Sequence, residues 1–351
     1  MSMNPKHLQS AQGAAESPVD RAAALGRELL AVAREAAAAG AAVLAERGRG
    51  KVAADTKSAA GDWVTDFDRR AEIAVRDVIA AARPNDAITG EEYGRTVPAE
   101  PSGYRWSIDP LDGTANFVRG IVYYCTSVAV FGPLDEAAAS ATSATSATSA
   151  PSSTATPEGN TLAADGAAMD AGTHGWLAAS INAPALGVEY YAAAGDGAWL
   201  IDSVLATGSD ARRGGSATRA QRLQGGDKEE AGRLLATGFG YDADRRQFQV
   251  AALLGLMPGF ANVRRIGSAA LDLCLVADGT LDAYAEYGTQ EFDWAAGALI
   301  AAEAGLPVLR PRTNPGWQAA GYLDFDALPA ESSLGEVPAA DQPASGAPAA
   351  K

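Results

Sequence analysis

The chain has 351 residues, 47% of them hydrophobic, which is enough for one large domain or about two smaller ones. Its formal net charge of −15 argues against a nucleic-acid partner, because phosphate backbones are bound by basic surfaces. The sequence has neither a membrane-spanning apolar run nor the apolar core of a signal peptide, so we expect a cytoplasmic protein without a membrane partner.

The first part of the chain predicts two helices after a disordered start. Residues 1–19 are small and polar, which is typical of disorder. Apolar residues then recur at helical spacing over 25–44 and again over 66–82. Thr65 and Asp68 match a capping box, so the second helix should begin between them.

The rest of the chain predicts strands first and an alternation of helices and strands afterwards. Short apolar runs separated by turn residues predict strands at 86–90, 104–109, 122–131, 176–183, 188–193 and 197–201. Later strands are expected at 233–238, 281–286 and 306–309, and helices at 243–256, 267–278 and 292–304. This order indicates a layered α/β or α+β domain.

Residues 135–173 interrupt this pattern with repeated Ser, Ala and Thr, a composition that cannot bury enough apolar surface to become ordered. We interpret them as an insertion at a hairpin tip, because the flanking strands look like neighbours in one sheet. A flexible linker between two domains is the alternative. The domain prediction is therefore a single domain over 20–330 containing this insertion, followed by a disordered tail over 331–351.

The few cysteine and histidine residues limit which metal sites and which acid–base groups the protein can have. Cys125 and Cys274 lie in separate apolar runs and are expected to be buried, reduced thiols. His7 and His174 both fall in stretches predicted to be disordered, which excludes a zinc site of the usual composition. Acid–base chemistry is then left to carboxylates, threonine or metal-bound water.

Two acids follow the strand predicted at 104–109. Asp109 would end that strand, Pro110 would break its ladder, and Asp112 with Gly113 would begin a turn. The free amides of Gly113 and Thr114, at the start of a short helix, could seat a phosphate. Nearby carboxylates would repel that phosphate unless cations lay between them, and Mg²⁺ is the usual choice. An ordinary surface turn is the alternative.

Other acids occupy similar positions and have structural explanations of their own. Glu91 and Glu92 follow the strand predicted at 86–90, but could form an exposed turn. Asp293 begins a predicted helix, where the helix dipole favours an acid. The glycines of residues 237–243 lie between a strand and a helix, as in dinucleotide-binding folds, but no acid follows at the required distance.

Three motifs in order resemble the inositol monophosphatase family of Mg²⁺-dependent, lithium-sensitive phosphatases. They are GEEY at 90–93, WSIDPLDGTANF at 106–117 and FDWAAGA at 292–298. The resemblance extends over about 30–310 except for the insertion. It implies the layered sugar-phosphatase fold, with helix and sheet layers in the order αβαβα, and a homodimer.

The resemblance also implies roles for residues of this chain. The metal ligands would be Glu91, Asp109, the carbonyl of Leu111, Asp112 and Asp293, holding two or three Mg²⁺ ions. The catalytic residues would be Thr114, Asp68 and Glu91, with Thr114 supported by Asp68 in orienting the attacking water. The substrate would contact Asp112, the amides of Gly113 and Thr114, and then Gly267, Ala269 and Glu286 at its alcohol portion.

The resemblance implies hydrolysis of a small phosphate monoester, with inositol 1-phosphate as the expected substrate. Histidinol phosphate, fructose 1,6-bisphosphate and 3′-phosphoadenosine nucleotides are the alternatives within the superfamily. Asn116, Phe117 and Glu286 favour inositol phosphate, whereas Arg119 could favour a histidinol-type or bisphosphate substrate. A non-catalytic regulatory binding protein on the same fold is the alternative from another class, but the complete set of acidic ligands argues against it.

Overall fold

The computed structural model describes residues 18–48, 50–57, 61–134, 173–203, 220–227 and 231–329. The first helix begins at Pro18, so the predicted disordered start extended two residues too far. Residues 1–17, 135–172 and 330–351 are outside the described part. The predictions of disorder for the N-terminus, the insertion and the tail fall almost entirely there.

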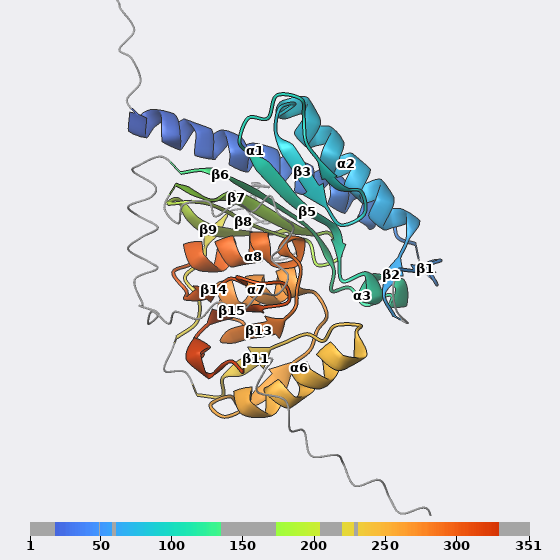
Figure 1. Cartoon of the computed structure of the whole chain (residues 1–351), viewed down its shortest axis with the longest axis vertical. Helices are drawn as coiled ribbons and strands as arrows, with labels where there is room; N and C mark the ends of the chain where they lie inside the picture. Colours follow the sequence, from blue (N-terminus) through green and yellow to red (C-terminus); the bar gives the residue numbers. More distant parts are fainter. Residues whose placement is uncertain are drawn as a thin grey trace, which may run out of the picture.

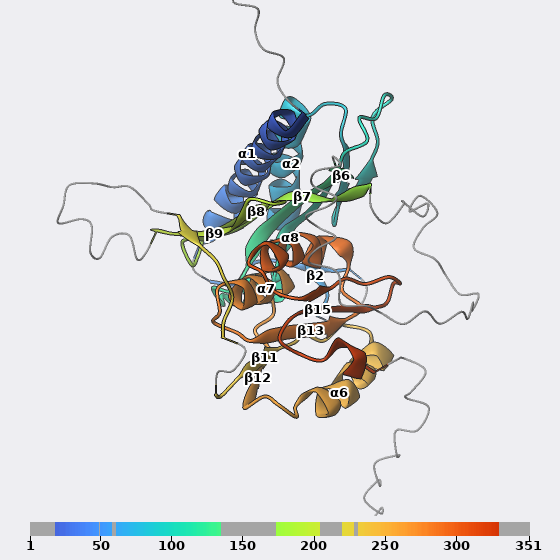
Figure 2. The same ribbon diagram turned by 90° about the vertical axis from the view of Figure 1, so that its left-hand side faces the viewer.

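Helices and sheets alternate in five layers, which confirms the predicted fold (Figures 1 and 2). Helices α1 and α2 pack together on the outer face of an eight-stranded sheet. Helices α7 and α8 lie between this sheet and a five-stranded sheet, and α6 covers the far side of the second sheet. The bounds are α1 Pro18–Ala45, α2 Asp66–Ala82, α6 Ala243–Leu256, α7 Ala269–Ala277 and α8 Glu291–Glu303.

The larger sheet has the strand order β10-β9-β8-β7-β6-β5-β3-β4. Only β3 and β5 pair in parallel, and all other neighbours are antiparallel. Strands β6 and β7 are adjacent, as expected for the two strands that flank the low-complexity segment. The bounds are β3 Ala87–Gly90, β4 Gly94–Thr96, β5 Arg105–Asp112, β6 Cys125–Pro133, β7 His174–Ala183, β8 Val188–Ala193, β9 Gly197–Asp202 and β10 Gln221–Arg222.

The smaller sheet has the order β12-β11-β13-β15-β14 and includes two strands that the sequence did not predict, β12 and β15. Strand β15 consists of the residues WQAAG, whose alanines and glycine carry little strand propensity. The bounds are β11 Leu234–Ala236, β12 Asn262–Arg264, β13 Ala283–Tyr287, β14 Val308–Leu309 and β15 Trp317–Gly321. Smaller elements are β1 Asp55–Thr56, β2 Trp63–Val64, α3 Thr114–Arg119 and the 3₁₀ helix η2 Phe325–Ala327.

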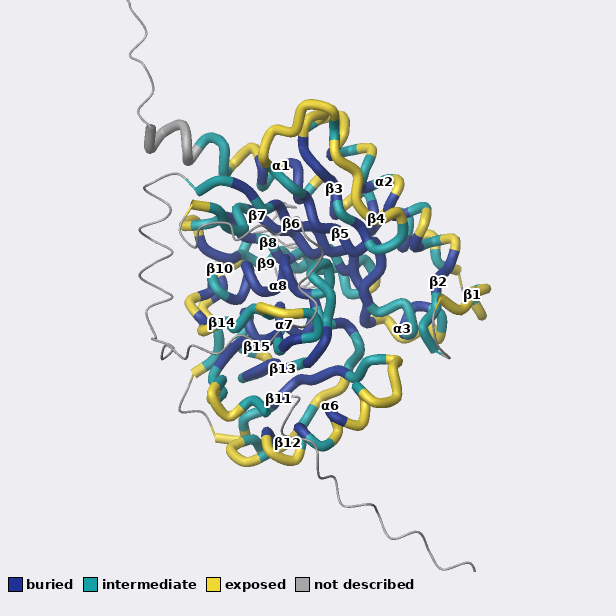
Figure 3. Tube along the Cα trace, in the orientation of Figure 1, coloured by how far each residue is buried: buried dark blue, intermediate teal, exposed yellow. Residues whose placement is uncertain are grey.

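Helix α8 is buried in the middle of the molecule (Figure 3). The larger sheet covers one side of it, and α7 and the second sheet cover the other. A helix covered on all sides needs apolar residues all round. Residues 294–301 of α8 are all buried. Gly297 allows the close approach of α7, since a Cβ atom there would lie 2.6 Å from the Cβ of Leu273. Many small side chains thus let two helices fit between the sheets.

Two expectations about single residue types have different outcomes. Cys125 and Cys274 are free and buried, as predicted. His174 is not in a disordered stretch: it begins β7 and stacks on Phe131, with ring centroids 6.2 Å apart. Within the described residues, no helix combines the length and the apolar character needed to cross a membrane.

Candidate active site

A cavity of about 520 Å³ brings together residues from distant parts of the chain. It lies where β3, β5 and β13 end and where α7 and α8 begin. All but one of the residues assigned by the resemblance line it, namely Glu91, Asp109, Leu111, Asp112, Gly113, Thr114, Gly267, Ala269, Glu286 and Asp293. The remaining one, Asp68, lies behind Thr114 and is hydrogen-bonded to it.

A bulge in β5 explains how Asp109 and Asp112 reach the same cavity. Residues three apart on a regular strand point to opposite faces. Here the pairing with β6 shifts between Asp109, which faces Ser127, and Asp112, which faces Cys125. The prediction that the strand ends at Asp109 was therefore wrong, because Pro110 interrupts the ladder but β5 continues to Asp112.

The turn after β5 requires a glycine. Gly113 has a φ of 93°, a left-handed conformation that side chains disfavour. A Cβ atom there would also lie 2.9 Å from the carbonyl oxygen of Tyr123. Gly113 thus lets the chain enter α3 directly after Asp112.

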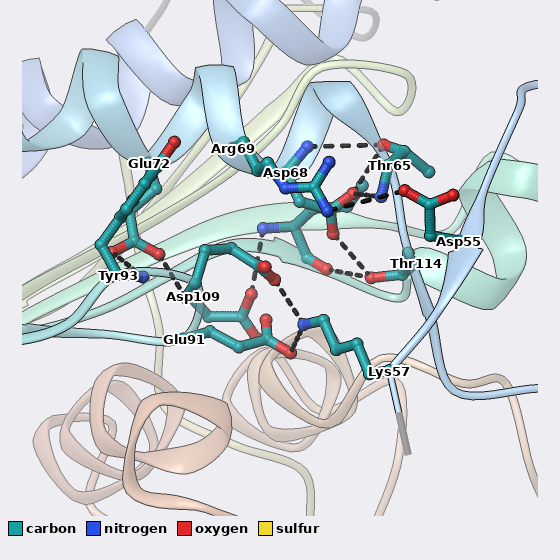
Figure 4. A network of polar contacts seen from close by, with 12 residues as sticks. Asp55, Lys57, Thr65, Asp68, Arg69, Glu72, Glu91, Tyr93, Asp109 and Thr114 are labelled. Atoms are coloured by element: carbon teal, nitrogen blue, oxygen red, sulfur yellow. Dashed lines mark hydrogen bonds and ion pairs between the residues drawn. The ribbon is translucent and has the colours of Figure 1, made fainter. Parts of the chain in front are cut away.

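Asp68 connects the start of α2 to Thr114 (Figure 4). Its Oδ2 accepts hydrogen bonds from the backbone N–H of Thr65 at 2.8 Å and from the Thr65 hydroxyl at 2.6 Å. The predicted capping box is confirmed, since the Thr65 side chain also accepts from the N–H groups of Phe67 and Asp68. Oδ1 of Asp68 lies 3.1 Å from the hydroxyl of Thr114. The cap therefore fixes one oxygen of Asp68 and leaves the other for Thr114.

The Thr114 hydroxyl has two possible acceptors for its single proton. Besides Oδ1 of Asp68, the carbonyl oxygen of Leu111 lies 2.9 Å away. Burial raises the pKa of Asp68, although hydrogen bonds from Thr65 and Thr114 oppose this effect. Thr114 can thus pass its proton toward a fully buried carboxylate.

Two further acids of the cavity are held by the helices that begin beside it. Oδ2 of Asp112 accepts from the hydroxyl of Ser268 and from the N–H of Ala270, both at 2.7 Å. Oδ2 of Asp293 accepts from the N–H of Gln290 at 2.6 Å, which forms the cap of α8. The helix-start explanation for Asp293 is therefore correct, and the same residue also lines the cavity.

The pKa values of Glu91, Asp109, Asp112 and Asp293 are all shifted upward, toward the protonated form. Burial raises the pKa of Asp109 well above its ordinary value, and repulsion by Glu91, Asp112 and Asp293 raises it further. Asp293 shows the same effect, from burial and then from Asp112 and Glu91. Burial raises the pKa of Glu91 to about 7 and that of Asp112 to about 6. At neutral pH, such a cluster calls for cations between its members.

Lys57 is a member of the site that our sequence reasoning missed. Its ammonium group pairs with Glu91 at 2.8 Å and with Glu92 (Figure 4). Burial lowers the pKa of Lys57, but the two glutamates outweigh this effect and raise the pKa above its ordinary value. The lysine is 34 residues from Glu91 and stands in an irregular loop, so spacing gives no signal. The guanidinium group of Arg265, also missed, lines the same cavity.

The donor atoms around the cavity suit Mg²⁺, which prefers oxygen ligands. Among the described residues, no three His, Cys, Asp or Glu side chains already converge as a complete metal site. Asp109 and Asp293 each hydrogen-bond to the backbone through one oxygen. Mg²⁺ needs only one or two carboxylates for each ion, because water and substrate phosphate fill the remaining positions. The residues therefore fit this ion.

Glu286 lines the far side of the cavity, against the glycine-containing loop at 237–243. The hydroxyl of Tyr284 donates to Oε2 of Glu286 at 3.0 Å. Burial raises the pKa of Glu286 to about 7. A Cβ atom on Gly238 would collide with the Glu286 carboxylate, so the glycine makes room for it. The loop that resembled a dinucleotide fingerprint thus forms a wall of this cavity.

Three residues used to choose among substrates lie outside the cavity lining. Asn116 is buried and donates to the carbonyl oxygens of Tyr123 and Ile266, at 2.8 and 2.9 Å. Phe117 packs edge-on against Phe67 and Tyr124 in the core. Arg119 is exposed and lies over the ring of Trp63. Of the residues cited in favour of inositol phosphate, only Glu286 lies where it can contact a ligand.

Comparisons with known proteins identify relatives over most of the chain. The sequence matches the inositol monophosphatase family over residues 26–142 and 171–336. It is 38% identical over 289 residues to the inositol-1-monophosphatase SuhB of Mycobacterium tuberculosis, covering 82% of this chain and 81% of that protein. It is 31% identical over 270 residues to a protein of Pasteurella multocida named Nus factor SuhB, covering 76% and 79%.

The solved structure of Mycobacterium tuberculosis SuhB is also similar to the present one. The two superpose with a TM-score of 0.55 at 33% sequence identity, covering 85% of this chain and 90% of the other. The similarity thus extends from the motifs to the arrangement of the layers.

Proposed function

Because the chain belongs to the inositol monophosphatase family, we propose that it hydrolyses a small phosphate monoester with the help of Mg²⁺. Inositol 1-phosphate is the proposed substrate. The observation that carries this proposal is the group of carboxylates from Glu91, Asp109, Asp112 and Asp293 in one cavity, where burial raises every pKa. A purely structural domain would gain nothing from this arrangement, since each acid has an unfavourable environment when ionised.

The proposed metal ligands follow the family pattern. Glu91, Asp109 and the carbonyl oxygen of Leu111 would hold one ion, and Asp109, Asp112 and Asp293 a second, with two or three ions in total. When bound, these ions would supply electrostatic stabilisation of the phosphoryl group and a nucleophile at neutral pH. Lys57, which now neutralises Glu91, would have to share or release that carboxylate.

Thr114 and Asp68 would orient the attacking water. In this proposal, water donates toward the Thr114 oxygen while the Thr114 hydroxyl donates to Oδ1 of Asp68. Asp68 can hold this position because Thr65 binds its other oxygen. The chain would thereby supply a short path for a proton leaving the cavity.

The remaining cavity residues would position the ester. The amides of Gly113 and Thr114 would bind phosphate oxygens, with Asp112 beside them. Gly267, Ala269 and Glu286 would contact the alcohol portion, and the carboxylate of Glu286 would accept hydrogen bonds from substrate hydroxyl groups. An acceptor for hydroxyl groups at this position supports a polyhydroxylated alcohol such as inositol over histidinol.

A regulatory binding role is the second candidate. The observation in its favour is that some relatives carry the name Nus factor. The acidic cavity, in contrast, favours catalysis. An activity assay distinguishes the catalytic role from the regulatory binding role. A homodimer and a cytoplasmic location are also proposed from the resemblance and from the sequence.

The test is phosphate release from a panel of esters, measured with Mg²⁺ and with EDTA. The panel contains inositol 1-phosphate, histidinol phosphate, fructose 1,6-bisphosphate and 3′-phosphoadenosine 5′-phosphate. We expect Mg²⁺-dependent release that is fastest from inositol 1-phosphate. Release from a different ester would correct the substrate, and no release from any ester by folded protein would leave the binding role as the better explanation.

A further inference from the structure

A second hollow of about 740 Å³ lies next to the candidate active site and carries only positive charge. We call it the basic groove and define it by its lining residues, which are Arg47, Gly50, Lys51, Val52, Trp63, Val118, Arg119 and Gly120. Three of these eight residues are cations and none is an acid. This is unusual in a chain with 43 acidic and 28 basic residues.

Arg47 is held rigidly at the wall of the basic groove. Its Nε donates to the carbonyl oxygen of Phe117 at 2.7 Å, and its Nη1 and Nη2 donate to those of Gly48 and Gly50 at 2.8 and 3.2 Å. Gly120 makes room for it, because a Cβ atom there would lie 3.2 Å from Nη2. Carbonyl oxygens fix the guanidinium group but do not neutralise its charge.

The other two cations also lack acidic partners in the part of the chain that the structure describes. Neither Lys51 nor Arg119 forms an ion pair with any residue in the described ranges, although both are exposed. Arg119 lies over the ring of Trp63, with its Cζ 5.2 Å from the ring centroid. On α1 and at both ends of α2, by contrast, arginines pair with acids, as Arg34, Arg70 and Arg83 do.

We propose that the basic groove binds a small polyanion that carries phosphate or carboxylate groups. Three like charges around one hollow repel each other, and an anion with several charged groups would relieve this repulsion. Arginine and lysine are the side chains that bind such groups most strongly. The net charge of the chain repels anions, so a local concentration of cations is what such a ligand requires.

The basic groove is separate from the acidic cavity but adjacent to it. Trp63 lines both, and α3 extends from Thr114 at the cavity to Arg119 at the groove. None of the proposed metal ligands lines the groove. Binding there would therefore need no metal ion, and the inference does not depend on the proposed phosphatase activity.

The test is calorimetric titration of the full chain with inorganic pyrophosphate and, separately, with citrate, in EDTA at constant ionic strength. We expect saturable binding of at least one probe, and the two probes distinguish a phosphate ligand from a carboxylate ligand. The double variant Lys51→Gln/Arg119→Gln should bind at least about tenfold more weakly, since it removes two of three cations. The matched control Arg69→Gln/Arg70→Gln removes two exposed charges from α2 and should change the affinity less than twofold.

The same variants keep the inference distinct from the proposed activity. Lys51→Gln/Arg119→Gln should retain its fold, as judged by thermal unfolding, because both side chains are exposed. Equal affinities in the wild type and this variant, or no saturable binding of either probe, would overturn the inference. Phosphate release by the wild type with Mg²⁺, measured in parallel, reports on the catalytic proposal alone.

Discussion

Asp112 combines a structural and a proposed catalytic role in one side chain. It joins β5 to the start of α7 through hydrogen bonds from Ser268 and Ala270, and it belongs to the cluster whose pKa values are raised. Asparagine has the same shape and keeps an oxygen that can accept both hydrogen bonds. A substitution can thus separate charge from packing.

We predict that Asp112→Asn lowers Mg²⁺-dependent turnover at least about a hundredfold, because it removes a negative charge that would bind the metal. The metal-free variant should be at least as stable as the wild type, since one source of repulsion is gone. Turnover with saturating Mg²⁺ and thermal unfolding in EDTA are the measurements. Near-normal turnover would contradict the assignment of Asp112 as a ligand.

Asp272 provides a matched control for this variant. It lines the same cavity and accepts a hydrogen bond from the hydroxyl of Tyr123 at 2.8 Å, but it is not a proposed ligand. Burial raises its pKa well above the ordinary value, which favours the neutral carboxylic acid. Asp272→Asn should therefore change turnover much less than Asp112→Asn does.

The start of α2 shows how a helix cap can also position a proposed catalytic group. The Thr65 hydroxyl caps the helix and also donates to Asp68, the residue that supports Thr114. The element thus connects local helix stability to the geometry of the cavity. A substitution at the cap residue should therefore change both the stability of the helix and the geometry of the cavity.

We predict that Thr65→Ala lowers the free energy of unfolding by about 1 kcal/mol, the usual effect of losing an N-cap. It should also lower turnover, because Asp68 loses one of the hydrogen bonds that fix its orientation. Thr65→Ser keeps the hydroxyl and should restore most of both properties. Denaturant unfolding and turnover measure the two effects, and equal losses in both variants would show that the hydroxyl is not responsible.

The acidic cavity affects the stability of the whole molecule. Glu91, Asp112 and Glu286 have folded-state pKa values of about 7, 6 and 7, above the ordinary values of carboxylic acids. The folded state therefore holds protons that the unfolded state releases. The stability contributed by these protonated groups is complete below about pH 4 and is lost as the pH rises through 6 and 7.

We predict that Mg²⁺ restores this stability, and does so more strongly as the pH rises. Bound Mg²⁺ favours the ionised carboxylates and should stabilise the folded state by about 3 kcal/mol at a hundredfold excess over its Kd. Thermal unfolding at pH 5, 6, 7 and 8, with EDTA or with Mg²⁺ at equal ionic strength, measures the effect. A stabilisation by Mg²⁺ that is as large at pH 5 as at pH 8 would contradict it.

The sequence by itself determined most of the helices, the longer strands, the layer order and the four acids proposed as metal ligands. Helix α2 and its cap were predicted with the observed bounds, because helical spacing and capping are local properties. The motifs at 90–93, 106–117 and 292–298 identified Glu91, Asp109, Asp112 and Asp293, since each motif is a continuous stretch of chain. Local patterns suffice where the relevant contacts lie within a few residues.

Only the tertiary structure decided which other residues join these acids. The bulge in β5 depends on pairing with β6, and the position of β15 depends on its neighbours β13 and β14. Lys57 pairs with an acid 34 residues away, and Arg119 reaches the groove beside Arg47 from a different segment. Such contacts join residues far apart in the chain, so their spacing carries no periodic signal, and only packing brings their charges together.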